Sequence, residues 1–453
     1  MRANRQSLAR VMRSAALVLL IWLIAGVAPR GQRGPLTATT VPATLATGTL
    51  KDGTVYTLVK PEKWNGTLFV DLDSGDLNSG TSNWLYARGV ARAGTTRVQI
   101  GSLVDRAADN LVETLDAFTA KFGKPTRPLI SGSSLGGQVA AVAAFRHPDR
   151  FQGALAFCGG LMGWAPYLNT NLDVAYTVRT LVAPQADLPL VRIPQDDAAL
   201  TARWQEVLKA AQQTPQGRAR IMLAVVLGQA PIWSTPDVPE PTSTDAHARQ
   251  EAAYRTLLDF SRQFTALRRR LEEPAGGGTS WNTGLDYTAA YRTRGAAERQ
   301  AVEALYREAG LSLETDLRAL DAAPRVPAEP GPVAFVRRLY PFDGNITIPV
   351  MTTSNTGDPY VWTAIDSAYA AAVRNAGKSD LLRMTYVHSA GHCGFSQAER
   401  IASFQVLLER LDTGRWPETT PAAMNARATA ANLGAARFWD YTPPAIERAS
   451  LTP

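Results

Sequence analysis

A serine between two glycines near residue 130 constrains the fold of this chain more than any other feature. The stretch Gly132-Ser133-Ser134-Leu135-Gly136 places a glycine two positions before and two positions after Ser134. That spacing suits a strand that turns sharply into a helix, because larger side chains at the flanking positions would collide. A short apolar strand pattern at 128–130 and an Ala-rich helical pattern at 136–146 surround it. The sequence therefore predicts an exposed serine at the tip of a strand–turn–helix unit.

Strand and helix patterns alternate on both sides of this turn. Two short strands joined by Lys51-Asp52-Gly53-Thr54 predict a hairpin near the start of the folded region. Strands are expected at 47–50, 55–59, 67–72, 90–95, 151–158, 348–354 and 381–388, and helices at 105–122, 362–376 and 396–411. Such alternation is typical of an α/β fold, a mostly parallel sheet with helices on both faces.

The alternation stops between residues 161 and 339, where no strand pattern occurs. Helices are expected there at 198–212, 218–227, 246–273 and 297–320, separated by loops rich in Pro and Gly. We therefore expect a core made of 47–160 and 340–412, with 161–339 inserted as a large helical cap. Residues 413–453 are expected to form a tail over the surface, partly ordered by Phe438, Trp439 and Tyr441.

The N-terminus has the pattern of an export signal. Four arginines lie within the first thirteen residues, and the uncharged apolar segment 14–28 follows them. We expect 1–28 to be a signal peptide of a periplasmic or secreted protein, or alternatively a membrane anchor through 14–28. Residues 29–46 are expected to be a linker. These four arginines supply more than half of the net charge of +7, and no basic stripe with interleaved aromatic residues occurs, so a nucleic-acid partner is not expected.

A nucleophilic serine needs a base and a group that orients the base. The chain has four histidines, of which His392 follows a predicted strand within a Gly-His loop, whereas His388 should be fixed on the strand itself. Asp358 follows the predicted strand at 348–354, and the interval to His392 holds one helix and one strand. That interval returns the chain to the adjacent strand end, so Ser134, Asp358 and His392 are the candidate catalytic residues.

The order Ser134, Asp358, His392 on this α/β pattern resembles the α/β-hydrolase superfamily, with 161–339 as its variable cap. The resemblance implies that Ser134 is the nucleophile, His392 the base and then the acid, and Asp358 its orienting partner. It also implies that the amide of Leu135 is one donor of the oxyanion hole. The second donor would come from the loop after strand 67–72. Members of the superfamily often have His-Gly there, whereas this chain has Asp73 and Ser74, whose amides are the candidates.

Two cysteines, Cys158 and Cys393, are the only ones in the chain. A pair in an exported protein favours a disulfide, and two unrelated buried thiols are the alternative. In the α/β-hydrolase fold both positions would lie at the carboxyl edge of the sheet, near the serine. Tannases and feruloyl esterases also have a cysteine just after the catalytic histidine. They pair it with one just before the serine, where this chain has Ser133, so the resemblance to that group is partial.

The sequence thus predicts a serine hydrolase that cleaves a carboxylic ester, small or polymeric, through an acyl-enzyme, without a metal or organic cofactor. The same residues would serve an amidase, a lactonase or an acyltransferase. A catalytically silent relative that only binds a ligand is the alternative from another class. A membrane-anchored interaction protein with a coincidental glycine–serine motif is a second. Membrane association is expected, if at all, only through the N-terminal segment.

Overall fold

The computed structural model describes residues 41–97 and 102–446, so the predicted leader and most of the predicted linker lie outside the described residues. The linker prediction was too long at its end, because Ala43–Ala46 belong to the first strand. The strands are β1 Ala43–Thr49, β2 Val55–Pro61, β3 Thr67–Asp71, β4 Ala91–Thr95, β5 Arg127–Ser133, β6 Ala154–Phe157, β7 Val350–Gly357 and β8 Leu382–Ala390. All eight form one sheet in the order β1-β2-β4-β3-β5-β6-β7-β8.

The sheet is mostly parallel, as the alternation predicts. Strands β1 and β2 form the expected hairpin, β2 pairs antiparallel with β4, and every further pairing through β8 is parallel. The strand order reverses at β3, which lies between β4 and β5. Loops leaving adjacent strands in opposite directions open a crevice at the carboxyl edge of such a sheet. The loop after β3 and the turn after β5 both lie at that point.

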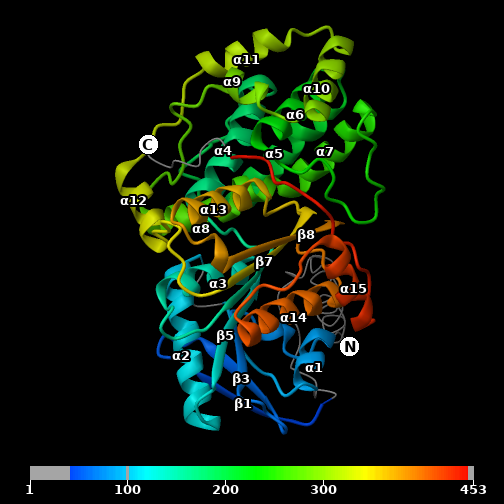
Figure 1. Ribbon diagram of the computed structural model, residues 1–453. Coiled ribbons are helices and arrows are strands. Elements are labelled where there is room, and N and C mark those ends of the chain that lie inside the picture. Colours follow the sequence, from blue (N-terminus) through cyan, green and yellow to red (C-terminus); the bar gives the residue numbers. More distant parts are fainter. Residues whose placement is uncertain (1–40, 98–101, 447–453) are drawn as a thin grey trace, which may run out of the picture. The chain divides into compact units, whose positions relative to one another are not determined.

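Helices cover both faces of the sheet, and side chains alternate between two apolar layers. Leu68, Val70 and Ile130 pack with helices α2, α3 and α13, whereas Phe69 and Leu129 pack with α14 and α15. Figure 1 shows α2 and α3 on one side of the strands and α14 and α15 on the other. The bounds of the helices around the sheet are α1 Gly80–Tyr86, α2 Val104–Phe122, α3 Leu135–Arg146, α13 Ala364–Asn375, α14 Gln397–Thr413 and α15 Pro421–Ala431, with short 3-10 turns at Ser74–Asp76 and Ser379–Leu381.

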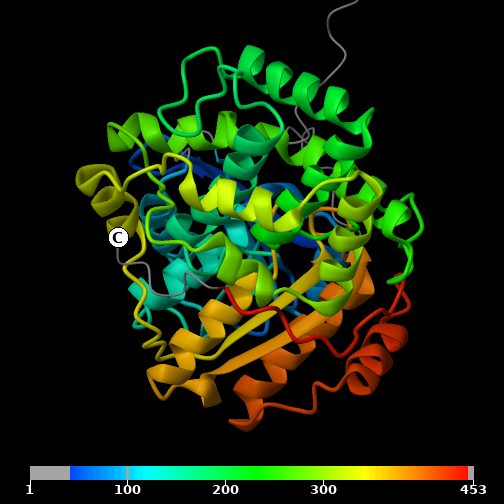
Figure 2. The same ribbon diagram turned by 90° about the horizontal axis from the view of Figure 1, so that it is seen from above.

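Helices α4 to α12 lie between β6 and β7, and we call this segment the cap. Their bounds are α4 Trp164–Leu181, α5 Asp197–Gln212, α6 Pro215–Gly228, α7 Ala246–Phe260, the 3-10 helix η2 Ser261–Phe264, α8 Ala266–Ala275, α9 Tyr287–Arg292, α10 Ala296–Glu308, α11 Leu313–Ala322 and α12 Pro330–Leu339. Most of them share an apolar core of their own around Trp204, Leu223 and Phe260. The first turn of α4 and the whole of α12 pack instead with the sheet. Seen from above, the cap helices cover the central strands (Figure 2).

Two long helices of the sequence prediction are each broken in the structure. The helix expected at 246–273 is interrupted at Thr265, whose backbone leaves the helical region (φ −121°, ψ −84°). The helix expected at 297–320 ends before Gly310, which has φ +66°, and a new helix starts after Ser312, whose side chain accepts the Thr315 amide. A glycine in the left-handed conformation typically ends a helix, and a serine whose side chain caps the following amides typically begins one.

Some elements escaped the sequence prediction altogether. Helix α4 was missed because almost all of its side chains are buried, so it lacks the polar stripe that marks a surface helix. The predicted surface tail is more ordered than expected: it contains helix α15, and Phe438 forms a bridge with Val387 beside β8. Across 41–97 and 102–446, no helix has both the length and the apolar character needed to cross a bilayer.

Candidate active site

Ser134 lies in a strained turn between β5 and α3, as the glycine spacing predicts. Its backbone has φ 60° and ψ −122°, a conformation that few non-glycine residues adopt. A Cβ atom at Gly132 would lie 2.1 Å from the carbonyl oxygen of Gly136, so any larger residue would force the backbone apart. A Cβ atom at Gly137 would lie 2.5 Å from the carbonyl oxygen of Phe157, a close approach that the five-residue motif does not include.

The structure brings Ser134, His392 and Asp358 together. The Nε2 atom of His392 lies 2.7 Å from the Ser134 Oγ, and its Nδ1 atom lies 2.9 Å from both carboxylate oxygens of Asp358. Asp358 is only 1% exposed, whereas the serine and the imidazole border an open cavity. This is the geometry of a nucleophile, a base and an orienting acid.

The Asp358 carboxylate is fixed by backbone donors. It follows β7 directly, and its oxygens accept the amides of Tyr360 at 2.8 Å, Val361 at 3.0 Å and Cys393 at 2.9 Å. Three amide donors satisfy the hydrogen-bonding capacity of this buried carboxylate, so it needs no lysine or arginine partner. They also fix the face that the carboxylate presents to His392.

Cys158 and Cys393 form a disulfide, as the sequence pairing predicts. Their Cα atoms lie 5.5 Å apart across a sequence separation of 235 residues. Cys158 directly follows β6, and Cys393 directly follows His392. The bond therefore joins the histidine loop to the end of the strand beside β5.

Comparison with known proteins identifies relatives of this chain. A protein named o-phthalyl amidase from Xanthobacter agilis is 32% identical over 427 residues, which are 86% of this chain and 92% of that protein. The family described as serine aminopeptidase, S33, matches residues 85–233. The chain belongs to the α/β-hydrolase superfamily.

Solved structures with a similar arrangement of the backbone include other hydrolases. Feruloyl esterase B from Aspergillus oryzae aligns with a TM-score of 0.39 and 13% identity, covering 83% of this chain and 80% of that chain. Candida antarctica lipase A in its closed state aligns with a TM-score of 0.37 and 11% identity, covering 84% and 82%.

The amides of Asp73 and Ser74 are the two candidates for the second oxyanion donor of this α/β-hydrolase. They differ in whether they already donate a hydrogen bond within the protein. The amide of Asp73 donates to the Asp71 carboxylate at 3.0 Å, so it is already used, which removes one of the two candidates. No acceptor for the amide of Ser74 is found in the described part of the chain. The Asp73 carboxylate is held by the guanidinium of Arg97, with Nε 2.6 Å from Oδ1. That ion pair neutralises the acidic side chain beside the serine turn.

The remaining histidines and the neighbouring serine have other contacts. His388 lies on β8, pairs with Glu240 at 2.8 Å and stacks on Trp439. His147, at the end of α3, contacts Asp109 at 2.9 Å. The Ser133 hydroxyl accepts from Arg400 at 2.7 Å. None of these groups replaces His392 or Ser134 in the triad geometry.

A cavity of about 320 Å³ lies over Ser134 and is lined by both the core and the cap. Arg262, Leu267 and Arg270 come from the cap, and Gln138 and Tyr360 come from the core. Burial, with repulsion from Asp259, raises the pKa of Tyr360 to about 12, so this phenol stays protonated. Sequence reasoning missed these residues. Only Gln138, one helical turn after Ser134, had a position that pointed to the site.

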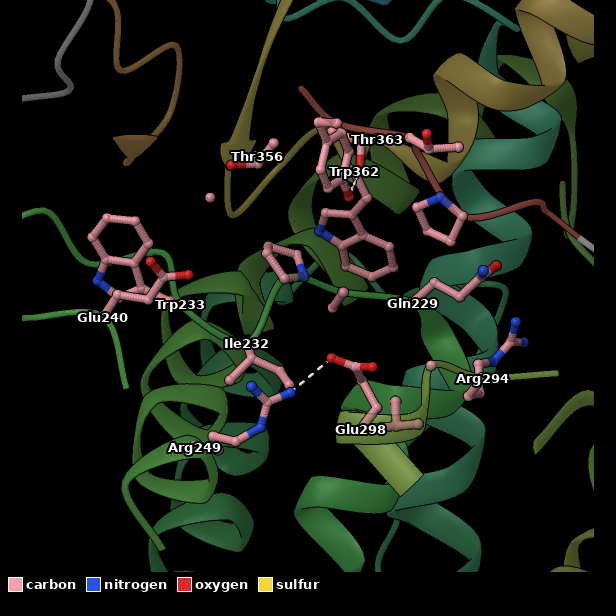
Figure 3. Close-up of a pocket in the computed structure, with 18 of the residues that line it drawn as sticks. Gln229, Ile232, Trp233, Glu240, Arg249, Arg294, Glu298, Thr356, Trp362 and Thr363 are labelled. Carbon is pink, nitrogen blue, oxygen red and sulfur yellow. Dashed lines mark hydrogen bonds and ion pairs between the residues drawn. The ribbon is translucent and has the colours of Figure 1, made fainter. Parts of the chain in front are cut away.

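A second cavity, of about 640 Å³, lies between the cap and the C-terminal segment (Figure 3). Trp362 and Thr363 form part of its wall, and the ion pair between Arg249 and Glu298 lies on the opposite side, with a separation of 2.7 Å. Neither Ser134 nor His392 lines it. The smaller cavity is therefore the one in which the triad can act.

Proposed function

We propose that this protein is a serine hydrolase that cleaves a carboxylic acyl bond through an acyl-enzyme on Ser134. The observation that carries the proposal is the continuous contact from Ser134 through His392 to the buried Asp358, at 2.7 Å and 2.9 Å. A serine held only for packing would need neither contact.

The proposed reaction uses the three side chains and two backbone amides. His392 Nε2 takes the proton from the Ser134 hydroxyl as its oxygen attacks the carbonyl carbon of the substrate. Asp358 holds the Nδ1–H of the imidazole and stabilises the positive charge that forms on the ring. The amides of Leu135 and Ser74 donate to the oxyanion of the tetrahedral intermediate.

Collapse of this intermediate breaks the bond to the leaving group. His392 gives its proton to the departing alcohol or amine, and the acyl group remains on Ser134. Water enters, His392 takes its proton, and a second tetrahedral intermediate releases the carboxylic acid and restores the serine. The cap covers the cavity and thereby limits the size of the acyl group.

An ester is the substrate class expected from the sequence, and an amide is the second candidate. The amide is favoured by the similarity to the o-phthalyl amidase, which extends over most of both chains. The two bonds differ in the leaving group that His392 must protonate, because an amine is a poorer leaving group than an alcohol. A 4-nitrophenyl ester and a 4-nitroanilide with the same acyl group, measured on the full chain, compare the two directly. Turnover of the anilide supports an amidase, and turnover of the ester alone supports an esterase.

Export to an oxidising compartment is part of the proposal. The disulfide between Cys158 and Cys393 supports it, because such bonds persist in oxidising surroundings. The mass of the protein recovered from its own host tests it. Loss of the first 28 residues or so supports a cleaved leader, and a full-length chain in the membrane fraction supports an anchor.

A further inference from the structure

Tyr360 lies between the catalytic residues and the cap. Its backbone amide donates to Oδ1 of Asp358 at 2.8 Å. Its ring meets the imidazole of His392 edge to face, with the ring centres 5.0 Å apart. The same residue therefore contacts both groups that activate Ser134.

The hydroxyl of Tyr360 reaches the cap. It donates to the exposed carboxylate of Asp259, near the end of α7, with 2.9 Å between the oxygen atoms, and it accepts from the guanidinium of Arg262 in η2. That guanidinium also lies over the Tyr360 ring, 4.9 Å from its centre. Burial, with repulsion from Asp259, raises the pKa of this phenol to about 12, so at neutral pH it keeps the proton that it donates. One side chain thus joins two charged groups of the cap to the loop that holds Asp358.

The cap segment that binds this hydroxyl also forms part of the cavity over Ser134. Arg262 lines that cavity together with Leu267 and Arg270 of α8, whereas Asp259 does not line it. The position of this cap segment is therefore linked both to the space for the acyl group and, through Tyr360, to the catalytic residues.

We propose that Tyr360 is a positioning residue that couples the placement of this cap segment to the orientation of Asp358 and His392. The proposal rests on the serine hydrolase function proposed above and adds a link between the cap and the triad. While Asp259 and Arg262 hold the hydroxyl, the Tyr360 amide keeps the Asp358 carboxylate facing the imidazole. Displacement of a catalytic group by about 1 Å can lower turnover by about a hundredfold, so a contact outside the cavity can control the rate.

The cap has a second, apolar contact with the same loop. Phe260 packs on Trp362 with ring centres 4.8 Å apart, and the Trp362 indole donates to the carbonyl of Pro359 at 3.1 Å. Tyr360→Phe removes only the hydroxyl and keeps these contacts and the ring beside His392. The variant should therefore remain folded with its cap attached, and its turnover reports on the hydroxyl alone.

A double-mutant cycle between Tyr360 and Asp259 tests the proposal on the full-length protein. Turnover of 4-nitrophenyl acetate and the rate at which a small fluorophosphonate labels Ser134 are measured in Tyr360→Phe, Asp259→Ala and the double variant. We expect Tyr360→Phe to lower kcat and the labelling rate by about tenfold and Asp259→Ala to lower both by about threefold, with KM changed by less than about twofold. The double variant should be no slower than Tyr360→Phe, because Asp259 acts only through the hydroxyl.

Glu251→Ala is the matched control, since this carboxylate lies on the same helix α7 and has its own ion pair, with Arg255 at 2.8 Å. It should leave turnover and labelling unchanged. Wild-type rates in both single variants, a loss confined to KM, or losses that multiply in the double variant would overturn the coupling and leave the hydrolase function intact. A folded wild type that neither cleaves the ester nor takes up the fluorophosphonate would overturn the hydrolase function, and the coupling with it.

Discussion

The carboxyl edge of the sheet and the cap face each other across one cavity, but different kinds of contact hold them in place. At the sheet edge the positions are set by the backbone: Gly132 against Gly136, three amides on Asp358, and the disulfide. On the cap side, helix α8 follows the break at Thr265 and reaches the cavity through exposed or half-buried side chains. Rigid backbone at the sheet edge therefore positions the catalytic groups. Side chains of the separately packed cap instead shape the part of the cavity that would select the substrate.

The largest effect is expected where the sheet edge orients the base. Asp358→Asn should lower kcat by about four orders of magnitude, because the amide no longer holds the imidazole in the productive tautomer. Steady-state kinetics on the ester and the anilide measure it. Glu240→Gln is the control, since Glu240 pairs with the other strand-end histidine, His388, at 2.8 Å. If the two variants lose similar activity, the pairing of His392 with Asp358 has no special role.

This difference between the two regions also decides what the sequence could predict. Close backbone approaches require glycine at fixed spacing, so the sequence was enough to identify Ser134. The alternation of strands and helices located Asp358 and His392 at neighbouring strand ends. Arg270 and Tyr360 reach the cavity through tertiary packing, which leaves no spacing in the sequence. Helix α4 was hidden because burial on all sides removes its amphipathic pattern. The Asp73 amide is already hydrogen-bonded to the Asp71 side chain, and no pattern in the sequence indicated that contact.

Loss of the disulfide should have the next largest effect, and this bond belongs to the sheet edge alone. The double variant Cys158→Ala with Cys393→Ala should lower the free energy of unfolding by about 4 kcal/mol, because it removes the constraint on a very long loop. Urea denaturation measures it, and reduction of the wild type should give a similar shift. A double variant as stable as the oxidised wild type would show that the bond does not constrain the fold.

A buried carboxylate beside the sheet, Asp366, should make the stability of the protein depend on pH. Glu272 in the cap contacts Arg268 at 3.8 Å, whereas Asp366 beside the sheet is 1% exposed and has no ion pair within the described ranges. Burial raises the pKa of Asp366 to about 7 in the folded protein. The folded state then holds a proton that the unfolded state releases above about pH 4, so stability falls from about pH 4 to about pH 7.

Asp366→Asn should remove that loss. We expect the variant to gain up to a few kcal/mol at pH 7 relative to the wild type and to show little difference below pH 4. Thermal unfolding at both pH values measures it, with Asp380→Asn, on a short surface turn, as the control. A gain that is equal at both pH values would contradict the assignment to a raised pKa.

The smallest effect is expected on the cap side of the cavity. Leu267→Ala should raise KM by up to about tenfold for a long acyl ester, because it removes apolar contact, and should leave kcat for an acetyl ester nearly unchanged. Leu258→Ala, at a half-buried position that packs against the cap core and lies outside the cavity, should lower stability without this change in KM. An equal loss of kcat on both esters in Leu267→Ala would mean that the cap also shapes the chemistry.

The central claim is that the Ser134 hydroxyl is the nucleophile, and covalent labelling tests it most directly. Intact mass after treatment with a fluorophosphonate should show a single label in the wild type and in Ser133→Ala, and peptide mapping should place it on Ser134. Ser134→Ala should remain folded and take up no label. A label on another residue, or a label that persists in Ser134→Ala, would contradict the account.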